Sequence, residues 1–229
     1  MKKILLVGIN AKYIHSNLAI RCLKAYAQKN GISSDIILQE YTINQNPFEI
    51  LEGIVSQNPD IIGFSCYIFN IEVTLKLIQD LKAVLSDCTI ILGGPEAGTK
   101  APELMEKHAE IDFIIRGEGE RPITLLLRAL EEEMNNFSDL PSLTYRIDSD
   151  LIETPLCEPL YHSSLPYRYT EEEIASLKHK IIYFESSRGC PFRCSYCLSS
   201  IDKHLRFFPI EEVLRQIKLF LDCRVQQVK

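Results

Sequence analysis

The sequence predicts a doubly wound α/β fold built on a parallel five-stranded sheet. Three observations predict it. Short apolar runs of strand length recur between residues 3 and 115, segments with apolar residues at helical spacing alternate with them, and polar or glycine-containing loops separate the two. Apolar runs without polar alternation are typical of strands that are buried on both faces, as in a parallel sheet covered by helices.

The first strand is expected at Lys3–Gly8, where six residues carry almost only apolar side chains. A helix is expected from about His15 to Asn30, and Gly31 follows where a helix should stop. Further strands are expected at Asp35–Gln39, Asp60–Ser65, Thr89–Gly93 and Asp112–Ile115. Further helices are expected at Pro47–Gln57, Ile71–Leu85, Pro102–Lys107 and Glu120–Met134. These β/α repeats predict a Rossmann-like domain over residues 1–136.

The pattern changes after this domain. A small hairpin is expected at Ser142–Ile147 and Leu151–Pro155, and a linker rich in Pro, Tyr and Ser at Pro159–Pro166. A charged helix is expected at Thr170–His179, a strand at Lys180–Glu185 and a last helix at Pro209–Leu221. The final VQQVK reads as a strand cut short. We therefore expect a hairpin and linker over 137–179 and the truncated start of a second β/α domain over 180–229.

Composition limits the class of protein. The chain has 229 residues, of which 46% are hydrophobic and 24% charged, as in a globular protein. A net charge of −6, without a basic run, does not favour nucleic acid as a partner. The opening MKKILLVGIN reads as a buried strand, and no apolar stretch approaches the roughly 20 residues of a membrane span. A cytoplasmic location is expected, where eight cysteines favour metal or redox chemistry over disulfides.

Four loops that follow predicted strands form the candidate ligand site, because ligands of such sheets bind outside the carboxyl ends of the strands. Their sequences are NAKYIHSN, SCY, GGPEAG and RGEGE. Each alone is also explained as a tight turn or a helix start, but together they predict a wide, mostly uncharged site for a large ligand. No GxxxxGK[ST] is present, and no GxGxxG follows the first strand, so dinucleotides and nucleoside triphosphates are disfavoured.

The stretch SRGCPFRCSYC holds three thiols in a C-x3-C-x2-C spacing, at Cys190, Cys194 and Cys197. Thiolates are the ligands of iron–sulfur clusters and of zinc. Three thiolates on a four-iron cluster leave one iron open for substrate chemistry. Two alternatives remain: a zinc knuckle completed by His204, and unliganded cysteines, which the polar neighbours Arg188 and Arg193 disfavour.

This cysteine stretch resembles the cluster loop of the radical S-adenosylmethionine (SAM) superfamily. The upstream Ser65, GGPEAG and RGEGE resemble the cobalamin-binding domain of its B12-dependent class, which includes anaerobic magnesium-protoporphyrin monomethyl ester cyclase and cobalamin-dependent methylases. The resemblance implies a cobalamin-binding type of Rossmann-like domain followed by the beginning of a radical SAM β/α barrel. It covers nearly the whole chain.

The resemblance implies three cofactors. The three cysteines would hold a [4Fe–4S] cluster that binds SAM and cleaves it to methionine and a 5′-deoxyadenosyl radical, with Tyr196 near the adenine. Cobalamin would then support methylation or cyclisation of an unactivated carbon. The residues implied in cobalamin binding are Asn10, His15, Ser65, Tyr67, Gly93, Gly94, Pro95, Glu96, Gly117, Glu118, Gly119 and Glu120.

The first loop departs from one version of this pattern. In cobalamin domains of the methionine synthase type, the histidine that ligates cobalt lies in DxHxxG, whereas NAKYIHSN has His15 without that aspartate and glycine. His15 is thus either an axial ligand or a capping or surface residue. The implied partners are a small-molecule substrate and an electron donor such as flavodoxin or ferredoxin. The alternative function is a module that binds cobalamin or another ligand, with a structural zinc loop and no radical chemistry.

Overall fold

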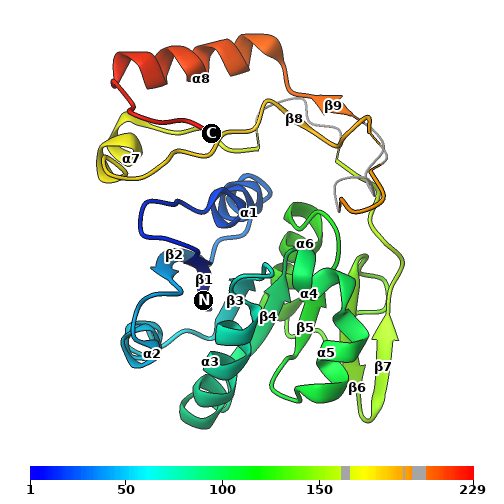
Figure 1. Cartoon of the computed structure of the whole chain (residues 1–229). Coiled ribbons are helices and arrows are strands. Elements are labelled where there is room, and N and C mark those ends of the chain that lie inside the picture. Colours follow the sequence, from blue (N-terminus) through cyan, green and yellow to red (C-terminus); the bar gives the residue numbers. More distant parts are fainter. Residues whose placement is uncertain (161–165, 193, 198–204) are drawn as a thin grey trace. The chain divides into compact units, whose positions relative to one another are not determined.

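The computed structural model describes residues 1–160, 166–192, 194–197 and 205–229. Contacts divide the chain into two compact units. The first comprises Met1–Tyr13 and Ala19–Pro159, and the second comprises Ile14–Leu18 and Leu160–Lys229. Figure 1 shows the elements of both units in chain order.

The first unit is built on one seven-stranded sheet with the order β2-β1-β3-β4-β5-β6-β7. Its strands are β1 (Lys3–Asn10), β2 (Asp35–Thr42), β3 (Ile61–Ser65), β4 (Thr89–Gly93), β5 (Phe113–Ile115), β6 (Leu143–Ile147) and β7 (Asp150–Glu153). Neighbours from β2 to β5 pair in parallel, whereas β6 and β7 form an antiparallel hairpin. The predicted parallel strands and the predicted hairpin are therefore confirmed.

The sheet has seven strands instead of the predicted five, because the hairpin pairs with β5 and is not a separate element. Strand β6 runs antiparallel to β5, with Phe113 opposite Tyr145. The two rings pack together with Phe137, with ring centroids 5.0–6.1 Å apart. Aromatic packing of this kind adds to the burial of apolar area, so the hairpin shares the core of the sheet.

Helices cover both faces of the sheet, which confirms the doubly wound fold. They are α1 (Leu18–Lys29), α2 (Pro47–Val55), α3 (Ile71–Val84), α4 (Pro95–Thr99), α5 (Ala101–Lys107) and α6 (Glu120–Glu131). Strand β1 shows why its sequence is apolar throughout: Leu5, Val7 and Ile9 belong to one buried cluster, and Ile4 and Leu6 belong to the other. Successive side chains of a strand point to opposite faces, and here both faces are buried.

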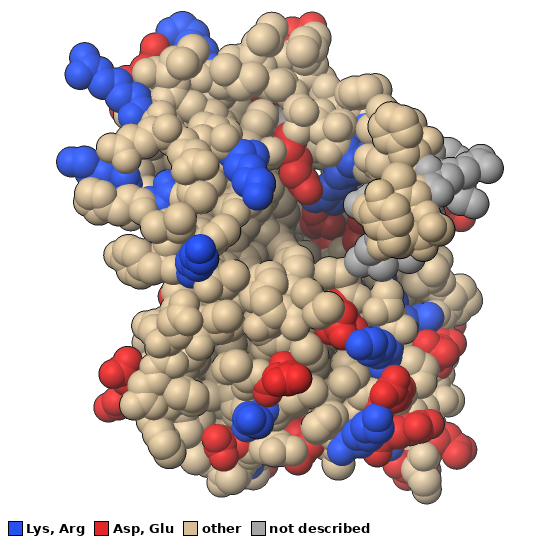
Figure 2. Space-filling model, viewed as in Figure 1, with Lys and Arg blue, Asp and Glu red and all other residues tan. Residues whose placement is uncertain are grey.

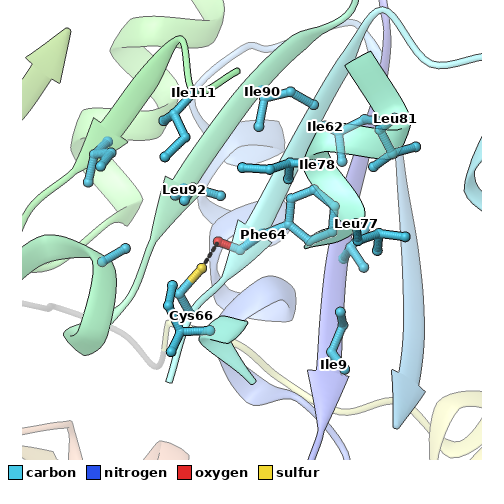
Figure 3. Packing of buried hydrophobic residues seen from close by; sticks show 14 of the residues in the cluster. Ile9, Ile62, Phe64, Cys66, Leu77, Ile78, Leu81, Ile90, Leu92 and Ile111 are labelled. Atoms are coloured by element: carbon cyan, nitrogen blue, oxygen red, sulfur yellow. Dashed lines mark hydrogen bonds between the residues drawn. The ribbon is translucent and has the colours of Figure 1, made fainter. Parts of the chain in front are cut away.

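Figure 3 shows part of the cluster beneath α3, where Leu77, Ile78 and Leu81 lie among residues of β3 and β4. Cys66 lies at one end of this cluster, and its thiol donates a long hydrogen bond to the carbonyl of Phe64, with 3.9 Å between sulfur and oxygen. The core therefore extends to the carboxyl end of β3, where the loops of the candidate site begin.

The second unit contains α7 (Glu171–Ser176), β8 (Ser187–Arg188), β9 (Arg206–Phe207) and α8 (Ile210–Asp222). Thr170 and Glu173 form a reciprocal capping box that starts α7. The predicted strand at 180–185 is not a regular strand, since it makes only isolated bridges at Ile181 and Ile182. Its backbone nevertheless pairs in parallel with the predicted final strand, because Ile182 N–H donates to Gln227 and Lys229 N–H donates back to Ile182.

Figure 2 shows one face of the molecule, on which charged side chains of both signs are present and residues of other kinds cover most of the area. In the described part of the chain, no helix is both long enough and apolar enough to cross a membrane.

Candidate functional site

The loops of the first unit lie at the carboxyl edge of its parallel strands. From β1 the chain crosses to β2 on one side, and it then returns to β3 on the other side of β1. The point between β1 and β3 is thus the topological switch point, where open α/β sheets leave a crevice for ligands. Three of the four predicted site loops follow β3, β4 and β5, and the remaining one follows β1.

The loop after β3 is organised by Asn70, which sequence reasoning did not select. Asn70 is completely buried. Its amide nitrogen donates to the carbonyls of Ile9 and Ser65, both at 2.9 Å, and its amide oxygen accepts from the backbone N–H of Tyr67 at 2.7 Å. The position directly before α3 is a sequence signal for a capping asparagine, but the side chain makes no helix-cap bond and instead joins two strand ends.

The loops after β3 and β4 are held together by main-chain bonds around Cys66. The Cys66 N–H donates to Gly93 at 2.7 Å, and the Cys66 carbonyl accepts from the N–H of Glu96 at 3.3 Å. Gly94 has a φ of 95°, and a Cβ there would lie 2.6 Å from the Cys66 carbonyl oxygen. Only glycine fits this approach. Burial raises the pKa of the Cys66 thiol to about 12.

Pro95 and Glu96, which sequence reasoning placed in a loop, begin the short helix α4. Proline suits a first helical turn, because the N–H it lacks would have no partner within the helix. The Glu96 carboxylate forms an ion pair with Lys100 one turn along the chain. The GGPEAG segment is therefore a strand end joined directly to a helix start.

The loop after β5 carries the remaining predicted contacts. Gly117 has a φ of 76°, and a Cβ there would meet nothing within 4 Å, so the backbone borders open space. Gly119 is close to Leu23, and Glu120 is the buried first residue of α6. Glu118 lies between the two glycines. Gly117 is therefore the point of this loop at which the main chain borders open space at the carboxyl edge.

The loop after β1 is divided between the two units. Asn10 is buried in the first unit and donates to Glu40, whose other carboxylate oxygen lies 2.5 Å from Arg21. His15 belongs to the second unit, where its Nδ1 lies 2.5 Å from the hydroxyl of Tyr183 and the two rings stack. The structure does not group His15 with the other predicted cobalamin contacts, and its role stays a prediction.

The cysteine stretch follows β8 in the second unit. Cys190 and Cys194 are half-buried and Cys197 is exposed, and the Cys197 N–H donates to the Cys194 carbonyl at 3.1 Å. Tyr196 is 91% exposed. Arg193 and His204 lie outside the described residues, as does the segment 198–204, so the zinc alternative is untested.

The chemistry of the donor set fits a thiolate-bound metal. All eight cysteines are described, and none forms a disulfide. Within the ranges that the structure describes, no three His, Cys, Asp or Glu side chains are gathered closely enough to hold a metal ion. Cys190, Cys194 and Cys197 are reduced thiols of the kind that binds an iron–sulfur cluster, and each is at least partly accessible. Their three sulfur atoms do not converge on one point in the described structure.

Comparison with known proteins decides the family. A family profile described as B12 binding domain matches residues 4–127. The chain belongs to the B12-binding domain family. The matched range takes in β1 to β5 and most of α6, so it contains every parallel strand of the sheet and all four predicted loops.

Curated relatives of this B12-binding protein are enzymes that are longer than the chain. It is 26% identical over 232 residues to the cobalamin-dependent radical SAM methyltransferase TokK of Streptomyces tokunonensis, covering 96% of this chain and 34% of the relative. It is 30% identical over 157 residues to anaerobic magnesium-protoporphyrin IX monomethyl ester cyclase of a Synechocystis species, covering 65% of this chain and 31% of the relative. The chain thus spans about a third of these relatives.

Solved structures show the same fold. The cobalamin-dependent SAM radical enzyme OxsB, with aqua-cobalamin and SAM bound, matches with a TM-score of 0.79 at 18% identity, covering 97% of this chain and 32% of OxsB. The radical SAM methyltransferase TsrM from Kitasatospora setae matches with a TM-score of 0.76 at 16% identity, covering all of this chain and 47% of TsrM. At these identities the likeness is evidence for the fold alone.

The loops of this B12-binding domain fit a cobalamin on their own geometry. The main chain at Gly117 adopts positive φ beside open space, where a ligand can approach the backbone, whereas the positive φ of Gly94 lets the loop after β4 pack closely on Cys66. The open space at Gly117 and the cluster of main-chain bonds around Cys66 lie on the same sheet edge. Large cofactors are commonly bound in this way, by a mostly uncharged edge with few polar groups.

Proposed function

We propose that this chain is the cobalamin-binding part, together with the beginning of the radical SAM part, of an enzyme that methylates or cyclises an unactivated carbon. The observation that carries the proposal is the presence in one chain of a B12-binding domain and, downstream of it, a C-x3-C-x2-C stretch. The likeness to TokK spans both features, since it covers 96% of the chain.

Cobalamin would be held by the loops after β1, β3, β4 and β5. Gly117 would allow the main chain to approach it, Gly93 and Gly94 would contact it from the end of β4, and Ser65 and Tyr67 would contact it from the end of β3. Asn10, His15, Pro95 and Glu96 are the further proposed contacts, with Glu118, Gly119 and Glu120. Cobalamin supplies a transferable methyl group or assists ring formation, while these residues bind and orient it.

Cys190, Cys194 and Cys197 would hold a [4Fe–4S] cluster, and Tyr196 would contact the adenine of SAM. The cluster supplies the electron for reductive cleavage of SAM, and an electron donor such as flavodoxin or ferredoxin would reduce it. Cys190 and Cys194 are half-buried, so metal binding there would be shielded from solvent in part. The substrate would be a small molecule.

Anaerobic reconstitution with iron and sulfide tests the cluster. We expect broad brown absorbance and about four irons per chain in the native protein, and neither in the Cys190→Ala/Cys194→Ala/Cys197→Ala variant. Cys223→Ala is the matched control, because this half-buried cysteine lies in the same unit outside the motif. Stoichiometric zinc without iron uptake would contradict the radical SAM proposal and favour the structural zinc alternative.

Titration with hydroxocobalamin tests the first unit separately. We expect stoichiometric binding that is unchanged in the triple cysteine variant, because the proposed cobalamin residues other than His15 lie in the first unit and the cysteines in the second. Absence of binding by the folded chain would remove the cobalamin assignment and leave the cluster test unaffected.

A further inference from the structure

Asn70 occupies the topological switch point of the sheet. Its amide nitrogen donates to two carbonyls near the carboxyl ends of adjacent strands, those of Ile9 in β1 and Ser65 in β3. These strands are in register with Gly8 opposite Ser65, so both carbonyls lie at the carboxyl edge. In open α/β sheets this is the place where a ligand enters. Here, the side chain of Asn70 links the carboxyl ends of the two strands by hydrogen bonds.

The same side chain also fixes the loop above that edge. Its amide oxygen accepts the N–H of Tyr67 at 2.7 Å, and the N–H groups of Asn70 and Ile71 both donate to the Tyr67 carbonyl at 3.0 Å. The loop Tyr67–Phe69 is thereby folded into a tight turn. Every hydrogen-bonding group of the buried Asn70 amide has a partner, as a buried amide requires.

The turn presents apolar side chains to solvent. The rings of Tyr67 and Phe69 stack with centroids 5.4 Å apart and an interplanar angle of 5°, and Ile68 is 82% exposed. A turn whose backbone is fixed by hydrogen bonds to a buried side chain loses its conformational entropy at folding and not at ligand binding, which favours binding. Ile68 and Phe69 are thus two adjacent exposed apolar side chains beside the half-buried Tyr67, and a contiguous exposed apolar patch can mark a binding site.

We propose that Asn70 is a positioning residue for the cofactor: it orders the Tyr67–Phe69 turn before the cofactor arrives, so that the turn meets the large, partly apolar macrocycle of a cobalamin. This proposal rests on the proposed cobalamin function. Asn70 does not itself contact the ligand, and it acts through Tyr67 and through the ends of β1 and β3.

The first experiment uses the chain's lack of tryptophan. Phe69→Trp places the chain's single tryptophan in the turn, where it can be excited selectively in the presence of the ten tyrosines, and its anisotropy without ligand reports local mobility. We expect Asn70→Ala in this background to lower the anisotropy. Thr74→Val is the matched control, because Thr74 is also fully buried, lies one turn along α3, and its hydroxyl has no hydrogen-bond partner among the described residues. Equal anisotropy in all three proteins would overturn the positioning role, since a purely global destabilisation leaves the folded turn unchanged.

The second experiment measures affinity for hydroxocobalamin by equilibrium dialysis. We expect Asn70→Ala to bind about tenfold more weakly and Thr74→Val to bind within about twofold of the native chain, in line with the net effect of losing one or two hydrogen bonds. Native-like affinity in a folded Asn70→Ala protein would overturn the proposal while the cobalamin function stands. If the native chain itself does not bind, the proposed function fails, and the anisotropy result still decides whether Asn70 orders the turn.

A third measurement requires no variant and applies if Asn70→Ala does not fold. Hydrogen exchange of the native chain, read by NMR, reports the Tyr67 N–H directly. We expect this proton to exchange much more slowly than in an unstructured peptide, because Asn70 accepts it from a fully buried position. Exchange at the unstructured rate would overturn the proposal.

Discussion

At the scale of single residues, the candidate cobalamin site depends on main-chain geometry more than on charged side chains. Gly94 passes so near to Cys66 that a Cβ would overlap its carbonyl oxygen. The Asn70 amide donates hydrogen bonds to carbonyls near the ends of both β1 and β3. Substitutions at these positions should therefore act on stability and on binding together.

Gly94→Ala is expected to destabilise the first unit more than Gly31→Ala does. Both glycines have positive φ, but a Cβ at Gly31 would meet nothing within 4 Å. The control should lower the free energy of unfolding by about 1–2 kcal/mol, from backbone strain alone. Gly94→Ala should lose about 1–3 kcal/mol more from steric overlap. Denaturant unfolding measures both, and equal losses would show that the Cys66 carbonyl can move away.

We expect the buried thiol of Cys66 to lower the free energy of unfolding at alkaline pH. Burial raises the pKa of its thiol from 9.0 to about 12. Below about pH 9 the thiol is protonated in both the folded and the unfolded chain. Above about pH 9 the unfolded chain releases the proton while the folded chain keeps it. The free energy of unfolding therefore falls as the pH rises toward 12, by up to about 1.4 kcal/mol per pH unit.

Cys66→Ala should show a shallower decline than the native chain between about pH 8 and pH 10 in denaturant unfolding. Cys157→Ala, at a half-buried cysteine of the same unit, is the control and should keep the native slope. A native slope in Cys66→Ala would mean that other groups cause the alkaline loss.

At the scale of elements, Arg116 joins the end of β5 to the hairpin. Its guanidinium donates to the carbonyls of Thr154 and Leu143 and lies 3.2 Å from the carboxylate of Glu153. Sequence reasoning placed Arg116 in a ligand loop, as part of RGEGE. The side chain instead holds the antiparallel extension of the sheet, while the following glycines remain available at the site.

Arg116→Ala is expected to loosen the hairpin without abolishing the parallel sheet. The loss leaves buried carbonyls with fewer partners, so the free energy of unfolding should fall by about 1–3 kcal/mol. Amide hydrogen exchange in β6 and β7 should speed up more than exchange in β1 and β3. Arg121→Ala is the control, because Arg121 is an exposed residue of α6. Uniform acceleration over the whole sheet would contradict the local role of Arg116.

At the scale of the whole molecule, two units share one chain, and cofactor binding should stabilise them unequally. Hydroxocobalamin at about 100 times its Kd should add about 2.7 kcal/mol to the free energy of unfolding of the first unit. Hydrogen exchange with mass spectrometry can follow peptides of the first unit and of α8 separately. We expect increased protection across β1, β3 and β4 and none that depends on cobalamin concentration in α8. Equal protection in α8 would mean that the two units unfold together.

Much of the fold is predictable from local pattern, and the exceptions have a common cause. The parallel strands are apolar on both faces, so their sequences alone identify them. The hairpin at β6 and β7 is equally recognisable, but its pairing with β5 depends on Phe113, Phe137 and Tyr145 meeting in space. The segment 180–185 has a strand-like composition, yet it forms only isolated bridges.

The sequence by itself determined the alternation of strands and helices and the spacing of Cys190, Cys194 and Cys197, because periodicity and covalent spacing are properties of neighbouring residues. Only the tertiary structure decided the strand order, the switch point between β1 and β3, and the place of Asn70 there. Asn70 lies 61 positions from Ile9, and no local pattern records a hydrogen bond between groups so far apart in the chain. The sequence thus gives the types of residue at the site and their order along the chain, whereas their arrangement in space follows from long-range packing.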